Sequence, residues 1–352
     1  MSPWLLEALV CPRHKTRLSL RPGTLTCSTG CSFPLVEDVP VMLVEEAPQT
    51  IDLSRSSLRQ GKVTNTDGDL FVESLGLSNE EKREVLELAA NKKTAIDPVV
   101  SCLVGATNGI AYKSLIGRLT EYPIPQLRLP ASEGNIFLDI GCSWGRWCMA
   151  AARKGYKVIG IDPSLGAVMA ARRVAKQLEI EADFLIGDAR YLPLAQSAVD
   201  CAFSYSVFQH FAKEDVALAV AEISRVVRKD GASHVQMPTR FGLRCLMHQM
   251  RRRFRAAAGF EVRYWSLPEL SQLFSSTLGP TTFSVDCFFG IGLQFSDLRW
   301  MTLAMKAVVI ASEAFRILSQ ALTSLIWVAD SVYVSSVNQK RAASPKWRLP
   351  IR

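Results

Sequence analysis

The feature that most constrains the fold is an alternation of apolar runs with amphipathic segments, which begins after Ala131. Short apolar runs are typical of buried parallel strands, and such strands need helical crossovers between them. Ser164 and Gly231 stand where one intervening helix would begin and another would end. The pattern predicts an α/β fold with a doubly wound parallel sheet. The expected strands are 135–141, 156–162, 182–188, 200–207 and 232–238, with a last strand at 331–337.

The first expected strand leads into the motif NIFLDIGCSWGRW, at 135–147. Asp139 lies on the strand, and Gly141 and Gly145 allow a tight turn in which backbone amides can approach a ligand. A dinucleotide fingerprint starting at Gly141 would need glycines at 143 and 146, where Ser143 and Arg146 stand. The motif therefore indicates a nucleotide-type pocket and disfavours NAD and FAD.

The spacing D-x-G-x-x-x-G resembles the first motif of class I S-adenosylmethionine-dependent methyltransferases, especially the type-11 family, and the resemblance extends over residues 131–240. It implies a Rossmann-like fold in which Asp162 accepts hydrogen bonds from both ribose hydroxyls and Asp188 receives the adenine amine. Ser143 departs from the glycine of many relatives. The cofactor-binding residues that the resemblance implies are Asp139, Gly141, Cys142, Ser143, Gly145, Asp162, Pro163, Ser164, Asp188, Ala189 and Ser204.

His210, in FSYSVFQHF, follows the fourth expected strand and is the candidate base for an acceptor hydroxyl. An imidazole titrates near neutral pH, although a packed or capping histidine is the alternative. His234, within the fifth expected strand, is interpreted as a core residue. The fourth-strand segment is not the Asn/Asp-Pro-Pro-aromatic motif of amino-methylating nucleic-acid enzymes, and the chain lacks a Pro-Cys nucleophile for cytosine C5 methylation. These two kinds of base methylation are therefore disfavoured.

The N-terminus holds a C-x2-H pair and a C-x3-C pair, separated by twelve residues. This spacing allows Cys11, His14, Cys27 and Cys31 to surround one structural zinc ion. Residues 4–44 resemble a zinc-ribbon-like family that includes partner subunits of tRNA and protein methyltransferases. His14 stands where many relatives have cysteine, and members without metal are common. A ribbon without zinc is therefore the alternative.

Positive charge is concentrated in one segment of a chain whose net charge is +8. Residues 240–263 contain seven arginines and one acid, Glu261. Arg251, Arg252, Arg253 and Arg255 are the candidates to bind an anionic acceptor such as a phosphate, RNA or an acidic glycan. A solvated helix face is the alternative.

A second unusual segment is an apolar helix expected from about Leu303 to Val328. Lys306, Glu313 and Arg316 interrupt it, so it does not qualify as a membrane span. We expect it to act as a buried cap or to contact a membrane surface.

These patterns predict a ribbon-like domain at 1–45, a solvated linker at 46–69 and a helical extension at 70–130. A methyltransferase domain follows at 131–340, and a tail at 341–352 ends the chain. The methyltransferase domain is expected to contain two insertions, at 240–263 and 302–328. Ser78 and Glu81 predict a capped helix start, and three prolines predict an extended segment at 120–130. The start of the sequence lacks the features of a secretory signal. We therefore expect the protein in the cytoplasm, free or at the inner membrane surface.

The first functional hypothesis is O-methylation of a small molecule or a lipid-linked saccharide, with S-adenosylmethionine as cofactor. The alternative is methylation of an rRNA or tRNA base, because ribosomal guanine methyltransferases resemble this order of zinc ribbon and type-11 domain. A second alternative is a scaffold that binds the cofactor without catalysis. The sequence does not identify the acceptor.

Overall fold

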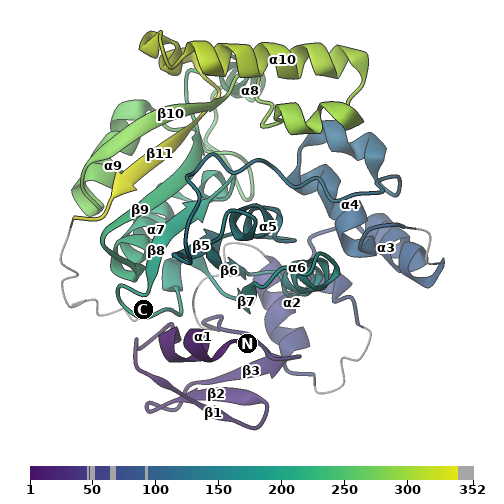
Figure 1. Ribbon diagram of the computed structural model, residues 1–352, viewed down its shortest axis with the longest axis vertical. Helices are drawn as coiled ribbons and strands as arrows, with labels where there is room; N and C mark the ends of the chain where they lie inside the picture. Colours follow the sequence, from purple (N-terminus) through teal and green to yellow (C-terminus); the bar gives the residue numbers. More distant parts are fainter. Residues whose placement is uncertain (46, 48–51, 64–68, 92–93, 340–352) are drawn as a thin grey trace.

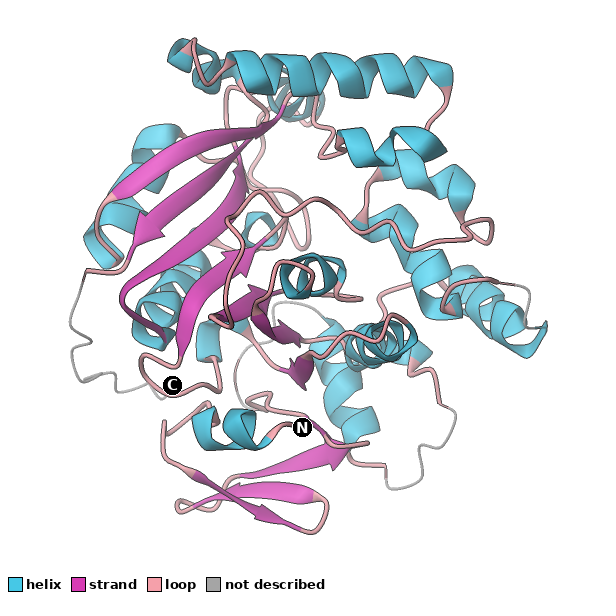
Figure 2. Ribbon diagram, in the orientation of Figure 1, coloured by secondary structure: helices cyan, strands magenta, loops and turns pink. Residues whose placement is uncertain are grey.

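The computed structural model describes residues 1–45, 47, 52–63, 69–91 and 94–339 (Figure 1). It contains a four-stranded antiparallel sheet near the N-terminus and a seven-stranded sheet that has helices on both faces (Figure 2). The predicted α/β class is confirmed, and the small antiparallel sheet fits the predicted zinc-ribbon-like domain.

Five strands of the large sheet run parallel, as the sequence predicts. The helix expected to end at Gly231 instead ends at Val226, and the last of these strands begins at Val227. The sheet order is β10-β11-β9-β8-β5-β6-β7. This order reverses direction next to β5, and ligands bind at such a switch point, beyond the carboxyl ends of the strands. The parallel strands are β5 (Ile136–Ile140), β6 (Lys157–Asp162), β7 (Asp183–Ile186), β8 (Val199–Ser204) and β9 (Val227–Pro238).

The remaining two strands extend the sheet beyond β9. The expected strand β11 (Ser331–Val337) pairs antiparallel with β9, and β10 (Thr281–Cys287) pairs antiparallel with β11. β10 is not among the sequence predictions. Buried and exposed side chains alternate only over the first half of β10, and Asp286 interrupts the apolar residues at its end. For these two reasons the sequence does not show a clear strand pattern.

Helices cover the sheet on both faces because the side chains of each strand alternate between them. Phe137 of β5 packs in the cluster that contains the helices α5 and α6, whereas its neighbour Leu138 packs in the cluster that contains α7 and α9. Ser164 caps α6, as predicted, by accepting a hydrogen bond from the backbone of Ala167 at 3.1 Å. The bounds are α5 (Arg146–Ala152), α6 (Leu165–Gln177), α7 (Lys213–Val226) and α9 (Leu267–Thr277).

The segment before the main domain differs from its prediction. Residues 52–61, expected within a solvated linker, form α2 (Asp52–Gly61). Ser57 of this helix donates to the carbonyl of Pro163 at 2.7 Å and accepts from the amide of Leu165 at 2.9 Å. These contacts bind α2 to the N-terminus of α6, and local composition does not reveal them.

The rest of this extension agrees with the sequence. The capping box predicted at α3 (Asn79–Asn91) is present, with Ser78 and Glu81 each accepting from the other's backbone amide. Residues 120–130 contain no helix. The other elements of the extension are η1 (Val72–Ser74), α4 (Pro98–Thr107) and η2 (Ile110–Leu115).

The ribbon-like unit packs directly on the edge of the large sheet. Met42 donates to the carbonyl of Ile186 on β7 at 2.7 Å, and Val10 donates to the carbonyl of Pro193 at 2.9 Å. Leu5 and Leu25 lie in the same apolar cluster as Leu138 of β5. The unit and the sheet therefore share one core. Its elements are α1 (Pro3–Ala8), β1 (Leu18–Arg21), β2 (Thr24–Cys27), β3 (Ser32–Val36) and β4 (Val39–Pro40).

Three segments at the opposite end complete the fold: α8 (Leu243–Arg251), α10 (Leu303–Leu318) and η6 (Thr323–Val328). The prediction of one apolar helix from Leu303 to Val328 is therefore wrong in its extent. The helix ends at Leu318, where the hydroxyl of Ser319 donates to the carbonyl of Arg316 and the chain turns. Within the described ranges, no helix combines the length and apolarity needed to cross a bilayer.

Candidate active site

The loop that follows β5 adopts a backbone that few sequences allow. Gly141, Ser143 and Gly145 all have positive φ values, of 78°, 47° and 80°. Glycine adopts this region freely, whereas a serine does so at a conformational cost, which the fold imposes on Ser143. The loop leads directly into α5 at the carboxyl edge of the sheet, where the sequence predicts the cofactor.

Asp162 joins this loop to the end of β6. One carboxylate oxygen accepts from the amide of Ser143 at 2.9 Å, and the other accepts from the amide of Ser164 at 2.9 Å. Burial raises the pKa of Asp162 to about 6, while the two amide bonds, from Ser164 and Ser143, oppose the rise. Each carboxylate oxygen keeps a second acceptor position, so the pair can still receive a diol.

Asp139 lies beneath the loop and is 1% exposed. One of its oxygens accepts from the thiol of Cys148 at 3.2 Å, and the other has no hydrogen-bond partner among the described residues. Burial raises the pKa of Asp139 to about 7, although the bond from Cys148 acts against this. A buried oxygen without a partner is unfavourable, and a bound polar group or water would satisfy it.

The carboxylate of Asp188, predicted to accept a hydrogen bond from the adenine, is already engaged within the protein. Both oxygens of Asp188 accept from the side chain of Arg190, which also bonds to Asp215 at 3.0 Å. Ser204 is fully buried, and its hydroxyl donates to the carbonyl of Ile140 at 2.9 Å. An adenine amine would therefore share the Asp188 carboxylate with Arg190, and Ser204 links two strands.

His210 lies beyond β8, in the turn η4 (Phe208–His210). Its Nδ1 lies 2.7 Å from the carbonyl of Phe260, so Nδ1 carries the proton, and the ring stacks on that of Phe260 with centroids 3.8 Å apart. Burial lowers the pKa of His210, an effect that the bond to Phe260 opposes and the charge of Arg263 assists. Nε2, the nitrogen without a proton, accepts a hydrogen bond from the side-chain amide of Gln209 at 3.1 Å, so a substrate hydroxyl would have to replace Gln209 before Nε2 could take its proton.

Four residues beside this edge, Arg146, Trp147, Tyr205 and Asp286, are absent from the predicted site. The ring centroids of Trp147 and Tyr205 lie 4.9 Å apart, and the guanidinium of Arg146 lies 5.2 Å from the Tyr205 ring. Tyr205 donates to the buried carboxylate of Asp286, at 3.1 Å. The aromatic residues Trp147 and Tyr205 lie at the ends of the expected loop and strand, so their position in the sequence could have indicated that they border the site. Asp286 could not have been found in this way, because it lies on β10, which the sequence did not predict.

The structure divides the arginines of segment 240–263 into two groups. Arg252 donates to the carbonyl of Val262, Arg255 pairs with Glu261, and Arg263 donates to the carbonyl of His210. These side chains hold the segment's own fold and place it beside His210. Arg251 and Arg253 are exposed and so are available to an anion.

The N-terminal cysteines and histidine converge as predicted. The thiol sulfurs of Cys11, Cys27 and Cys31 lie 3.6, 3.9 and 3.5 Å from Nδ1 of His14. All four ligand atoms lie within 4.8 Å of one another. With zinc bonds of about 2.0 to 2.3 Å, the edges of a tetrahedron are roughly 3.3 to 3.8 Å long, so the set fits one ion.

A separate cavity of about 500 Å³ opens on the face of the sheet. Phe203, Tyr333 and His234 line it, and Arg128 and Arg316 contribute polar groups. His234, expected as a satisfied core residue, bonds to Ser335 of β11 at 2.9 Å and also borders this cavity. None of the residues 141–145 lines this cavity, but its residue Phe203 lies with its ring centroid 5.1 Å from that of Trp147.

The order of the strands and the loop after β5 resemble those of a class I, Rossmann-like methyltransferase domain. A family model described as a methyltransferase domain matches residues 137–231. The chain is 40% identical over 110 residues to an uncharacterized 37.1 kDa protein in transposon TN4556 of Streptomyces fradiae, covering 29% of this chain and 30% of that protein. It is 34% identical over 103 residues to the ubiquinone biosynthesis O-methyltransferase of Brucella ovis, covering 29% and 41%.

The solved structure of the YcgJ protein from Bacillus subtilis is similar over 60% of this chain and 94% of its own, with a TM-score of 0.42 and 18% identity. The matched region spans less than half of both curated relatives.

Proposed function

We propose that the protein is an S-adenosylmethionine-dependent methyltransferase that O-methylates a small molecule or a lipid-linked saccharide. The observation that supports this most directly is the carboxylate of Asp162, which lies between the amides of Ser143 and Ser164 beside a loop of positive φ values. A carboxylate in this position suits a ribose diol. A relative of the domain from Brucella ovis is an O-methyltransferase by name.

The bound cofactor would supply a methyl group that its sulfonium already activates. The protein would mainly position the cofactor and the acceptor, because holding two reactants in line lowers the activation barrier of methyl transfer by several kcal/mol. Asp162 would hold the ribose, and the loop from Gly141 to Gly145 would hold the amino-acid end. Nε2 of His210 would accept the proton of the acceptor hydroxyl, because Phe260 fixes the proton of the ring on Nδ1.

The acceptor that this site favours is anionic. Arg251 and Arg253 are exposed on a segment that contacts His210 through Phe260 and Arg263, so negative charge would be attracted close to the base. An extended RNA track receives less support, because Arg252, Arg255 and Arg263 are engaged within the protein. Methylation of rRNA or tRNA is thus the second candidate.

The ribbon-like unit would hold one structural zinc ion. The near-tetrahedral spacing of three sulfurs and Nδ1 of His14 supports this. Because Met42 bonds to Ile186 of β7, the ion would also stabilise this edge strand. This role is structural, since four protein ligands would leave no open coordination position.

The proposed activity is tested by incubating the full chain with methyl-labelled S-adenosylmethionine and separated lipid, saccharide and RNA fractions of cell extract. Label in the lipid or saccharide fraction, as an ether or ester, is the expected result. Label in RNA would establish the second candidate. Cofactor binding with no label in any fraction would contradict catalysis and support the scaffold alternative.

A further inference from the structure

The helix α10 buries polar groups and leaves most of its apolar side chains exposed, unlike an ordinary surface helix. Its inward side presents Ser312 and Glu313, 1% and 3% exposed, beside the fully buried Val309. A surface helix normally buries its apolar side and exposes its charged side. The buried polar groups of α10 therefore need hydrogen-bonding partners within the protein, and its exposed apolar side chains would be more stable against an apolar surface.

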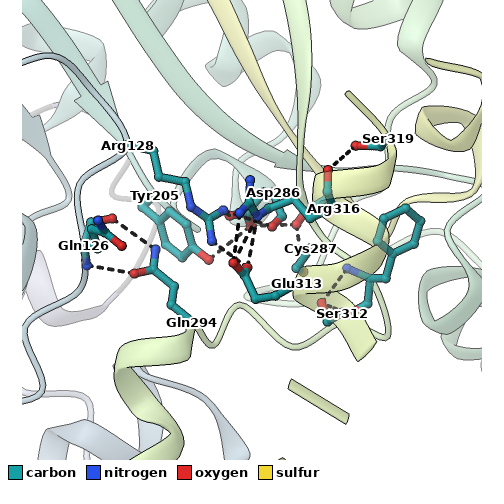
Figure 3. Close-up of polar contacts among 12 residues, drawn as sticks. Gln126, Arg128, Tyr205, Asp286, Cys287, Gln294, Ser312, Glu313, Arg316 and Ser319 are labelled. Atoms are coloured by element: carbon teal, nitrogen blue, oxygen red, sulfur yellow. Dashed lines mark hydrogen bonds and ion pairs between the residues drawn. The ribbon is translucent and has the colours of Figure 1, made fainter. Parts of the chain in front are cut away.

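The partners on the inside form a network of polar contacts (Figure 3). Glu313 pairs with Arg128, from the extended segment, at 2.6 Å and with Arg316 at 3.0 Å. The hydroxyl of Ser312 donates a hydrogen bond to the carbonyl of Phe288 and accepts one from the backbone amide of the same residue, both at 3.1 Å. Asp286 approaches Arg128 at 4.0 Å. These contacts fix the rotation of α10 about its own axis.

The rotation places a continuous apolar stripe in solvent, which we call the α10 stripe. Its members recur every three or four residues, the spacing of one helix face, and no charged side chain is among them. Leu303 is 84% exposed, and Ile310 and Ile317 are each 49% exposed. The stripe consists of Leu303, Ala304, Ala307, Ile310, Ala314, Ile317 and Leu318.

The helix α8, which has exposed cations on and beside it, is linked to α10. Phe289 joins the two helices, because its carbonyl accepts from Arg244 of α8 at 3.3 Å and its ring lies 6.1 Å from that of Phe315 of α10. Around α8, the exposed side chains are apolar or basic. They include Phe241, Leu243, Met250 and Phe254 together with Arg240, Arg251 and Arg253.

Acidic groups do not offset this charge. Within the described range 240–263 the one acid is Glu261, which Arg255 engages, and on α10 the acid Glu313 is buried. An apolar face beside uncompensated arginines complements a surface that offers hydrocarbon and negative charge together. In Figure 1 α10 lies along the outer end of the molecule, opposite the ribbon-like unit, so a flat surface can reach its whole length.

We propose that the α10 stripe and the exposed arginines of the α8 segment dock the protein on an anionic lipid bilayer. The helix lies in the plane of the bilayer, with Ile310 and Ile317 in the boundary between headgroups and acyl chains. A second copy of the chain is a poorer occupant, because a symmetric contact would bring the same arginines together. Docking does not depend on the proposed catalytic activity.

The test is cosedimentation of the purified full chain with vesicles of phosphatidylglycerol and phosphatidylcholine, and with vesicles of phosphatidylcholine alone. We expect binding to the first and at least tenfold weaker binding to the second. Ile310→Asp combined with Ile317→Asp should weaken binding to the anionic vesicles at least tenfold. Leu86→Asp is the matched control, because Leu86 on α3 is also 49% exposed.

A second pair of variants isolates the charge. Arg251→Ser with Arg253→Ser should weaken binding several-fold and reduce its dependence on salt, whereas Arg21→Ser with Arg83→Ser, far along the chain, should not. Circular dichroism checks that each variant is folded. Failure of the wild type to bind anionic vesicles would overturn the proposal, as would unchanged binding of the Ile310/Ile317 variant. Dimerisation through Ile310, without vesicle binding, would equally overturn it.

Discussion

A carboxylate oxygen of Asp162 lies 2.9 Å from the backbone nitrogen of Ser143. This contact ties the end of β6 to the loop after β5, at the place where Ser143 has a φ of 47°. The carboxylate thus stabilises the backbone conformation of the loop that would contact the cofactor. The same side chain is the proposed partner of the ribose.

Replacing Asp162 with Ala should weaken the affinity for S-adenosylhomocysteine about tenfold to somewhat over a hundredfold. This range corresponds to about 1.5 to 3 kcal/mol for hydrogen bonds to a charged group. Equilibrium dialysis measures the change. Glu181→Ala, at an exposed acid before β7, is the control and should bind as the wild type does. Equal affinities of the two variants would remove Asp162 from the site.

The pH dependence of turnover should report His210. Its pKa is lowered, so Nε2 is unprotonated at neutral pH, and activity should fall only as the pH drops below the usual histidine value of about 6.5. His210→Gln should reduce kcat by about 10²- to 10⁴-fold and abolish this acidic limb. His234→Gln, at the half-buried histidine that bonds to Ser335, should retain it. An acidic limb that survives in His210→Gln would assign the proton to another group.

Elemental analysis of protein purified without added metal should find one zinc ion per chain. His14→Ala should lose most of it, whereas His14→Cys should keep it, because a thiolate is an equally suitable ligand. A chelator should lower the thermal unfolding temperature of the wild type, since structural zinc contributes to folding. Less than about a tenth of an equivalent, with no effect of chelator, would show that the ribbon folds without metal.

The two exposed arginines of the α8 segment should act on the acceptor and not on the cofactor. Arg251→Ser with Arg253→Ser should raise the KM of a water-soluble anionic acceptor about two- to tenfold, the size expected for exposed ion pairs. The affinity for S-adenosylhomocysteine should not change. Because the acceptor is soluble, steady-state kinetics separates this effect from docking on vesicles. An unchanged KM would mean that these arginines do not contact the acceptor.

Sequence reasoning predicted the parts of the fold that local patterns determine. The five parallel strands and β11 follow from apolar runs, and the starts of α3 and α6 follow from the caps Ser78 and Ser164. The convergence of Cys11, His14, Cys27 and Cys31 follows from their spacing. Each of these signals lies within a few residues of the element that it specifies.

The features that escaped prediction depend on contacts between distant parts of the chain. α2 is bound by Ser57 to residues more than a hundred positions away, and β10 is paired by β11 from the far end of the domain. The inward position of Glu313 depends on Arg128, 185 residues earlier. The internal use of Arg252 and Arg263 could not be read from charge alone, because their partners are backbone carbonyls.

Calorimetric titration of the full chain with S-adenosylhomocysteine, and in parallel with NAD, tests the central claim most directly. The claim is that the loop from Gly141 to Gly145 and the carboxylate of Asp162 form a cofactor site of the methyltransferase type. The account predicts one site per chain that binds S-adenosylhomocysteine in the micromolar range and no measurable heat with NAD. Absence of S-adenosylhomocysteine binding by the folded protein, or preferential binding of NAD, would contradict it.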